Sequence, residues 1–226
     1  MYSITSLTLL AATSMIVAAS SSSSNLSPPP LTITVNKNIT YQRIHGFGFS
    51  EAFQRAHSLV NLPEPYQSQV LDLLFSPTTG AGFSILRIGL GSSVNSTGDK
   101  MNSPQPHPDQ SFTWDGKDSG QVWVARQAKD KYNVSMFYGD AWSAPGWMKT
   151  NGADHGGGWL CGVSGEGKDV ELMHSAESGG GKTQCGEGES YVQAYGEYIA
   201  KYVQAYALEG GIEMSYVGFL NEPNLV

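Results

Sequence analysis

The chain alternates segments patterned like strands with segments patterned like helices, and this order constrains the fold more than any other feature. Short apolar runs bounded by glycine or polar residues predict strands at 44–50, 83–89, 134–138 and 214–220. Apolar residues spaced three and four apart predict helices at 63–79, ended by Gly80 and Gly82, at 120–132 and at 190–208. Alternating β and α units with apolar strands form a parallel sheet covered by helices. The pattern fits a doubly wound α/β sheet or a β/α barrel.

The first residues have the character of a secretion signal followed by a linker. Residues 7–19 form an apolar run too short to cross a bilayer, and Val17 and Ala19 suit a cleavage site. The usual basic residue before the run is absent, and a buried helix is the alternative. We expect a signal peptide at 1–19 and a Ser- and Pro-rich linker at 20–30. Leu31, Ile33 and Val35 then alternate with polar residues, which predicts a strand.

Glycosylation triplets and a cysteine pair agree with an extracellular destination. The triplets begin at Asn25, Asn38, Asn95 and Asn133. The two cysteines, Cys161 and Cys185, lack the spacing and the histidine partners of a zinc site. In an oxidising compartment we expect them to form a disulfide, and two free thiols are the alternative.

Charge and motifs exclude several classes of function. The formal net charge is −7, and no run of Lys or Arg is present. Nucleic acids and anionic membrane surfaces both require clustered positive charge, so neither is an expected partner. Residues 179–183 (GGGKT) lack the earlier glycine and the preceding buried strand of a phosphate-binding loop. We expect no cofactor and no metal.

Polar and aromatic residues gather where the predicted strands end. In a barrel the carboxyl ends of the strands form the active face. The residues at these ends are Glu51, Arg55, Arg87, Asp140, Trp142, Asn221 and Glu222. Glu222 is a candidate general acid at this edge. The alternative is that Asn221, Glu222 and Pro223 form only a turn, because Asn and Pro favour turns.

Four motifs in order resemble the secreted members of glycoside hydrolase family 30. They are HGFGFSEAFQRA (45–56), GAGFSILRIGLGSS (80–93), DAWSAPGWMKTNG (140–152) and VGFLNEPN (217–224). The pattern is most similar to the fungal xylan-cleaving branch and runs from about residue 33 to residue 224. The resemblance implies a (β/α)8 TIM barrel at 45–226, with residues 31–44 contributing to a side β-domain. It also implies a secreted, monomeric, retaining glycosidase that acts on a plant cell-wall polysaccharide, with xylan as the expected substrate.

The resemblance also implies roles for individual residues. Glu222 matches the acid/base, and Asn221 matches the residue that binds the sugar 2-hydroxyl. Arg87 would hydrogen-bond the catalytic centre, and Trp142 would line the −1 sugar site. Glu51 and Arg55 would lie beside the cleft, where Arg55 can pair with a uronic acid branch. A local ion pair between Glu51 and Arg55 is the alternative.

The sequence departs from the family pattern in two places. Retaining hydrolysis uses two carboxylates, and the family nucleophile lies at the end of strand seven, which nothing in this sequence matches. We therefore expect an N-terminal half barrel without turnover of its own. Residues 165–184 add a polar, aperiodic stretch between the cysteines, expected to be a disordered insertion or translated non-coding sequence. A β-1,6-galactanase, a glucosylceramidase-like hydrolase and a non-catalytic sugar-binding product are the alternative functions.

Overall fold

The structure of the chain is a computed structural model that describes residues 31–51, 54–95, 100–163 and 185–222. The predicted signal peptide, the linker, Asn25, Pro223 and the expected insertion at 165–184 lie outside these ranges. The chain divides into two units, residues 1–43 and 44–226, which are taken separately below.

The described part of the first unit, residues 31–43, contains a turn at 37–38 and no strand. All of its side chains are exposed, including Leu31, Ile33 and Val35. The strand predicted from their alternation is therefore not found, because a strand needs a neighbour to satisfy its backbone groups and none of the described residues pairs with this segment. Whether residues 31–44 belong to a side β-domain stays a prediction.

The second unit is built on four parallel strands in the order β1-β2-β3-β4. Their bounds are β1 Gly48–Ser50, β2 Ile85–Leu90, β3 Met136–Ala141 and β4 Tyr216–Gly218. Each strand is hydrogen-bonded to the one that follows it in the sequence, and the register pairs Ser50 with Arg87, Arg87 with Tyr138, and Asp140 with Gly218. A doubly wound sheet reverses its strand order at a switch point. This sequential order does not reverse, so of the two predicted alternatives it is the barrel arrangement.

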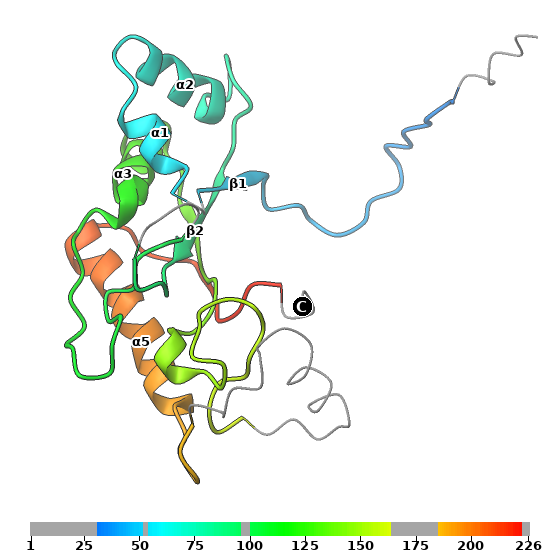
Figure 1. The fold of residues 1–226 in the computed structure, drawn as a ribbon. Coiled ribbons are helices and arrows are strands. Elements are labelled where there is room, and N and C mark those ends of the chain that lie inside the picture. Colours follow the sequence, from blue (N-terminus) through cyan, green and yellow to red (C-terminus); the bar gives the residue numbers. More distant parts are fainter. Residues whose placement is uncertain (1–30, 52–53, 96–99, 164–184, 223–226) are drawn as a thin grey trace, which may run out of the picture. The chain divides into compact units, whose positions relative to one another are not determined.

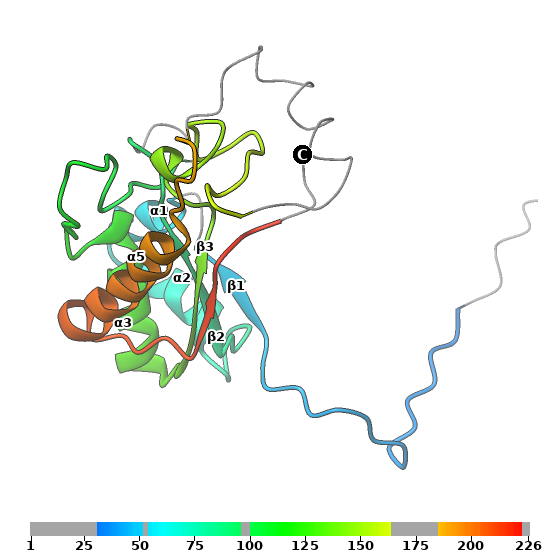
Figure 2. The ribbon, with the colours of Figure 1, turned by 90° about the horizontal axis from the view of Figure 1, so that it is seen from below.

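The helices lie on one side of the sheet (Figures 1 and 2). Their bounds are α1 Ala56–Val60, α2 Tyr66–Phe75, α3 Gln121–Tyr132 and α5 Val192–Ala205, which continues as a π-helical turn at Tyr206–Gly210. Short 3₁₀ turns occur at Asp118–Gly120 and Gly146–Met148. Helix α3 ends where Asn133 adopts a left-handed conformation, which closes the helix by bonding back to Lys129. Helix α1 was not expected, because five residues are too few to show a period.

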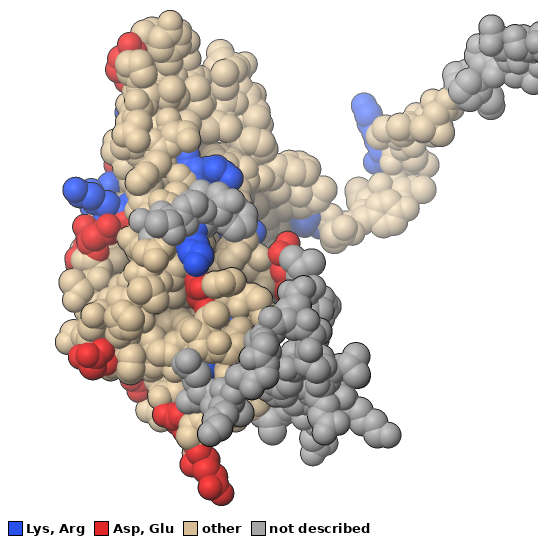
Figure 3. All heavy atoms as spheres, viewed as in Figure 1, with Lys and Arg blue, Asp and Glu red and all other residues tan. Residues whose placement is uncertain are grey.

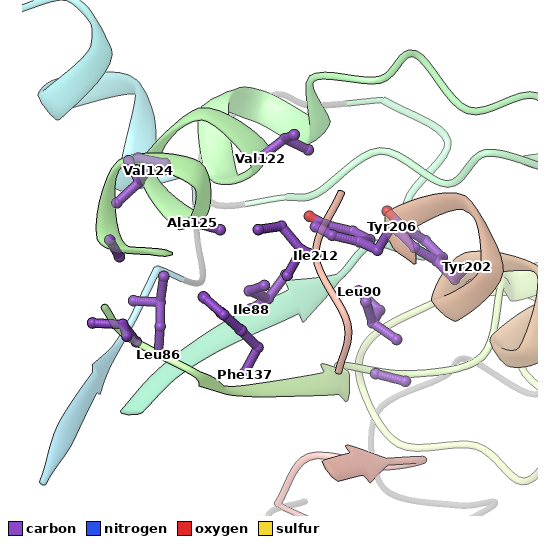
Figure 4. Close-up of a cluster of buried hydrophobic side chains, with 14 of the residues drawn as sticks. Leu86, Ile88, Leu90, Val122, Val124, Ala125, Phe137, Tyr202, Tyr206 and Ile212 are labelled. Carbon is purple, nitrogen blue, oxygen red and sulfur yellow. The ribbon is translucent and has the colours of Figure 1, made fainter. Parts of the chain in front are cut away.

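The core lies between the sheet and helices α3 and α5 (Figure 4). Side chains alternate along a strand, so Leu86, Ile88 and Leu90 of β2 point together toward the helices and are fully buried. Val124 and Ala125 of α3 meet them from the other side. The tyrosines of α5 recur at helical spacing, and Tyr195, Tyr198 and Tyr202 are buried on its inner face.

The same alternation turns the remaining side chains of the strands to the opposite face of the sheet. Ile85 and Arg87 of β2, together with Met136, Tyr138 and Asp140 of β3, have this orientation. Arg87 and Tyr138 are only partly buried. This face therefore carries the chemistry of the strands, while the helix-covered face carries the packing.

The surface shown in Figure 3 is formed mostly by uncharged residues, with acidic and basic side chains scattered among them. Within the described ranges, none of the helices combines the length and the apolar character needed to cross a bilayer.

Candidate active site

The candidate site lies at the carboxyl edge of the sheet and centres on Arg87. This side chain projects from β2 on the face away from the helices. Its Nη2 donates hydrogen bonds to Asp140 Oδ2 on β3 and to Asn221 Oδ1 just after β4. Three neighbouring strand regions are thereby joined through one guanidinium. Because Arg87 and Asp140 are oppositely charged and Asp140 is only 3% exposed, the contact is a partly buried ion pair.

Two aromatic rings surround the guanidinium. The ring centroid of Trp142 lies 4.8 Å from Arg87 Cζ, and that of Tyr138 lies 6.0 Å away. Tyr138 also donates a hydrogen bond of 3.0 Å to Asp140 Oδ1, so both oxygens of this carboxylate are engaged. The charge of Arg87 is thus held in place by a carboxylate, an amide and two ring faces, which favours a fixed orientation.

Gly218 on β4 provides the space that this arrangement needs. A Cβ at this position would lie 2.1 Å from Asp140 Oδ1 and 2.4 Å from the Tyr138 hydroxyl. Any larger residue would push Asp140 away from Arg87. The glycine of the sequence VGFLNE is therefore required by packing against the site.

Glu222 lies beside this network and is exposed. It adopts a left-handed backbone conformation with φ of 47°, which is uncommon for a residue with a side chain. Asn221 is held by Arg87, and the segment before it is held by the Tyr195 hydroxyl, which donates to Phe219 O at 2.6 Å. The structure brings Arg87, Trp142 and Asn221 together, with Glu222 next in the chain. Their roles toward a sugar stay predictions.

Glu51 is placed differently from what a cleft residue would require. It follows β1, continues the ladder by donating its N–H to Arg87 O at 2.9 Å, and is 1% exposed. Neither of its carboxylate oxygens has a hydrogen-bond partner among the described residues, so the alternative of an ion pair with Arg55 is not realised. Burial and the nearby charge of Asp118 raise the pKa of Glu51 well above its usual value. Arg55 itself is exposed, next to the first residue of α1.

Another buried carboxyl group, that of Asp118, was not singled out from the sequence. It accepts hydrogen bonds from Tyr202 at 3.2 Å and from Tyr206, and it sits at φ of 44°. Burial raises the pKa of Asp118 to about 7, although the hydrogen bonds from Tyr206 and Tyr202 act to lower it. The sequence did contain a signal for such an acceptor. Tyrosines recur at helical spacing, and buried tyrosine hydroxyls need hydrogen-bond partners.

Gln121 replaces a missing strand contact next to these carboxylates. Its side-chain amide accepts from Gly89 N at 2.8 Å and donates to Gly89 O at 2.9 Å. These backbone groups of β2 lie beyond the point where β1 ends, at Ser50. The amide of Gln121 therefore satisfies the β2 backbone at the end of the short β1 strand.

The structure joins Cys161 and Cys185 in a disulfide, with a Cα–Cα distance of 5.8 Å. Of the predicted glycosylation acceptors, Asn38, Asn95 and Asn133 are exposed. Their modification stays a prediction. In the described ranges, no group of three or more His, Cys, Asp and Glu side chains is placed to hold a metal ion.

Comparisons with known proteins identify the family and the fold of the chain. The family model described as glycosyl hydrolase family 59 matches residues 45–163. A galactocerebrosidase of Salmo salar is 32% identical over 120 residues, and an endo-1,6-beta-D-glucanase of Trichoderma harzianum is 27% identical over 207 residues. The catalytic domain of GH30 xylanase C from Talaromyces cellulolyticus is 40% identical, with a TM-score of 0.63 over 84% of this chain.

The chain spans only part of these relatives. The matches cover 53% of this chain and 16% of the galactocerebrosidase, and 87% of this chain and 38% of the glucanase. The xylanase domain is covered over 39% of its length. The partial barrel predicted from the sequence is confirmed, as is the similarity to family 30. With its family model matched over more than half of its length, the chain belongs to glycosyl hydrolase family 59 and shares the α/β fold of a family 30 xylanase.

Proposed function

We propose that the protein is a secreted glycosidase that hydrolyses a β-linked plant cell-wall polysaccharide, xylan, with retention of configuration. The 40% identity to a GH30 xylanase supports the substrate. The predicted leader and glycosylation triplets support secretion. We further propose that the protein acts as a monomer on its polysaccharide.

The observation that carries the proposal is the immobilised Arg87 beside Glu222. A glycosidase must hold a sugar ring in one orientation while charge develops at the reacting carbon. Arg87 is oriented by Asp140 and Asn221, and the Trp142 ring forms a flat wall next to it. Fixed donors beside an aromatic wall suit a neutral, hydroxyl-bearing ligand.

Glu222 supplies the proton transfers in this proposal. As a carboxylic acid it protonates the leaving glycosidic oxygen, and as a carboxylate it then removes a proton from the water that releases the sugar. Asn221 hydrogen-bonds the 2-hydroxyl of the same sugar. The exposure of Glu222 gives a substrate direct access to its carboxyl group.

The retaining reaction also needs a nucleophilic carboxylate about 5–5.5 Å from the first. Asp140 is linked to Asn221 through Arg87, but both of its oxygens already accept hydrogen bonds, so we assign it to positioning. We expect the nucleophile in a segment equivalent to the part of the relatives that this chain does not cover.

Hydrolysis assays on a panel of polymers test the proposal. The whole protein is incubated with β-1,4-xylan, β-1,6-galactan, β-1,6-glucan and glucosylceramide, and new reducing ends are counted. Release from xylan at a rate well above the other substrates is expected, and the first product formed should be the β-anomer by proton NMR. A preference for any of the other substrates would overturn the assignment to xylan, and an α-anomer would overturn the retaining mechanism.

Arg55 provides a finer test of substrate choice. Its exposed guanidinium can pair with the carboxylate of a uronic acid branch. Arg55→Ala is expected to lower activity on acid-branched xylan while leaving activity on unbranched xylan unchanged. An unaltered ratio between the two substrates would contradict this role.

A further inference from the structure

A groove at the opposite edge of the sheet from the candidate active site is not used by the proposed chemistry. Its volume is about 580 Å³, and sites that hold small molecules usually measure roughly 300–1,000 Å³. The groove is lined by the last turn of α3, by the residues that lead into β3 and by the segment just before β4. It therefore lies at the amino edge of the parallel strands.

The floor of the groove is apolar and held in place. Val134 and Phe137 line it and are only 4% and 2% exposed. Val134 N donates to Ala128 O at 3.0 Å, and Ser215 N donates to Phe137 O at 2.8 Å, so backbone hydrogen bonds fix both residues. A preformed apolar floor suits the C–H face of a sugar ring, because little of the protein has to be ordered when the ring packs on it.

The rim of the groove offers hydrogen-bonding groups of both kinds. Lys129 lines it, and its Nζ donates to Gly211 O at 2.7 Å. A lysine ammonium has three N–H donors, so this anchored group keeps others for a ligand. Exposed carboxylates on the same rim can accept hydrogen bonds from hydroxyls. An apolar floor with a polar rim fits a neutral sugar better than a purely apolar ligand.

The groove also contains an amide that can be modified. Asn133 lines it, is exposed, and begins the triplet Asn133-Val134-Ser135. Its backbone has a φ of 58°, and its N–H bonds to Lys129 O at 3.2 Å where α3 ends. Within the described ranges, neither the Asn133 side-chain amide nor the Ser135 hydroxyl has a hydrogen-bond partner. Both groups that a glycosylation triplet requires are therefore accessible.

The other acceptor triplets lack this setting. Asn38 belongs to residues 31–43, and none of the side chains in that segment is buried. The triplets that begin at Asn25 and Asn95 extend outside the residues that the structure describes. Among the described triplets, the one at Asn133 is thus distinguished by a walled surface beside its acceptor nitrogen.

Covalent attachment makes weak contacts in the groove sufficient. A group joined through a short flexible link has an effective concentration of the order of millimolar at its neighbouring site. A sugar whose affinity is too weak to bind from solution therefore still fills a groove beside its own attachment point. The contacts that it makes there are present only in the folded state and so favour folding.

We propose that Asn133 carries an N-linked glycan whose first sugar units lie in this groove and stabilise the folded protein. The donor is an oligosaccharide on a lipid diphosphate. The bond from Asn133 Nδ2 to the anomeric carbon forms, the bond from that carbon to the diphosphate oxygen breaks, and the lipid diphosphate leaves as the amide gives up one proton. This inference rests on the proposed secretion, because a chain meets this donor on the secretory route.

Thermal unfolding of matched variants of the whole protein tests the proposal. Ser135→Ala removes the triplet and leaves the left-handed Asn133 in place, Ser135→Thr keeps the triplet, and Thr40→Ala removes the one at Asn38 as the control. Each variant is made in yeast behind a yeast secretion leader, so that modification does not depend on residues 1–19, and in a bacterium without N-glycosylation.

In the yeast proteins, peptide mass spectrometry should find a glycan on Asn133 in wild type and in Ser135→Thr. The thermal midpoint of Ser135→Ala should lie roughly 3 °C below that of wild type. Ser135→Thr and Thr40→Ala should match wild type. In the bacterial proteins, Ser135→Ala and wild type should unfold at the same temperature.

Three results would overturn the proposal. They are an unmodified Asn133 in the yeast protein, equal midpoints of glycosylated wild type and Ser135→Ala, and a bacterial Ser135→Ala that loses as much as the yeast one. These results are independent of the proposed function. A protein that hydrolyses xylan but shows no shift would refute only the glycan groove, whereas a shift in a protein that hydrolyses no polysaccharide would support the groove and refute the enzyme.

Discussion

Removing the buried, titratable carboxyl of Asp118 is expected to change how stability depends on pH. The side chain is buried, is bonded by Tyr202 and Tyr206, and has a pKa of about 7 against an ordinary value of 3.8. The folded state therefore holds a proton that the unfolded state releases between pH 4 and 7. Stability from this group is fully present below pH 4 and is lost as the pH rises through 7.

The magnitude follows from the size of this shift. Each pH unit in the window costs about 1.4 kcal/mol, so about three units give a loss of about 4 kcal/mol in the free energy of unfolding. Asp118→Asn removes this titration. The substitution suits the position, because asparagine tolerates the left-handed conformation found there. Glu51, whose pKa is also raised, titrates in the same direction and remains in the variant.

Urea unfolding at pH 4.5, 5.5, 6.5 and 7.5 measures the effect for wild type, Asp118→Asn and the exposed control Asp130→Asn. As the pH rises, wild type should lose several kcal/mol of unfolding free energy relative to Asp118→Asn. The control should follow wild type. Parallel pH profiles for wild type and Asp118→Asn would refute the account of a buried, proton-holding carboxyl.

Two further sets of substitutions probe the ion pair and the disulfide. Arg87→Met leaves Asp140 buried without its cation and is expected to destabilise the protein by about 3 kcal/mol in urea unfolding, with partial recovery in the double variant Arg87→Met/Asp140→Asn. No recovery would mean that the pair is not coupled. Replacing Cys161 and Cys185 by serine opens a loop with a sequence separation of 24 residues. The free energy of unfolding should fall by about 3 kcal/mol, which is measured as a lower thermal midpoint. An unchanged midpoint would contradict a stabilising disulfide.

The sheet and its main helices could be predicted because their patterns are local. Apolar runs located β2, β3 and β4, and the spacing of tyrosines located α5 to within a few residues at each end. The strand expected at 31–35 is not formed among the described residues, and its place in a side β-domain stays a prediction. A period of two shows that a segment suits a strand, but its pairing depends on a partner distant in the sequence.

The site could be predicted only in part. Arg87 lies on a strand, and Trp142, Asn221 and Glu222 follow strands. Parallel strands bring their carboxyl ends to one edge, so the proximity of these residues follows from topology. The burial of Glu51 and its electrostatic coupling to Asp118 depend on which side of the chain each residue faces after β1 and before α3. The Tyr138 hydroxyl donates to Asp140. The sequence alone shows Tyr138 only as one residue of a predicted strand.

Turnover by Glu222→Gln tests the central claim most directly. The whole protein and this variant are compared on xylan and on an aryl xyloside, with Glu213→Gln as an exposed control just before β4. The account predicts that kcat on xylan falls by at least about 100-fold in Glu222→Gln, whereas formation of the enzyme-bound sugar from the aryl substrate, whose leaving group needs no proton, is largely kept. Glu213→Gln should behave as wild type. Full activity of Glu222→Gln on xylan would contradict the account.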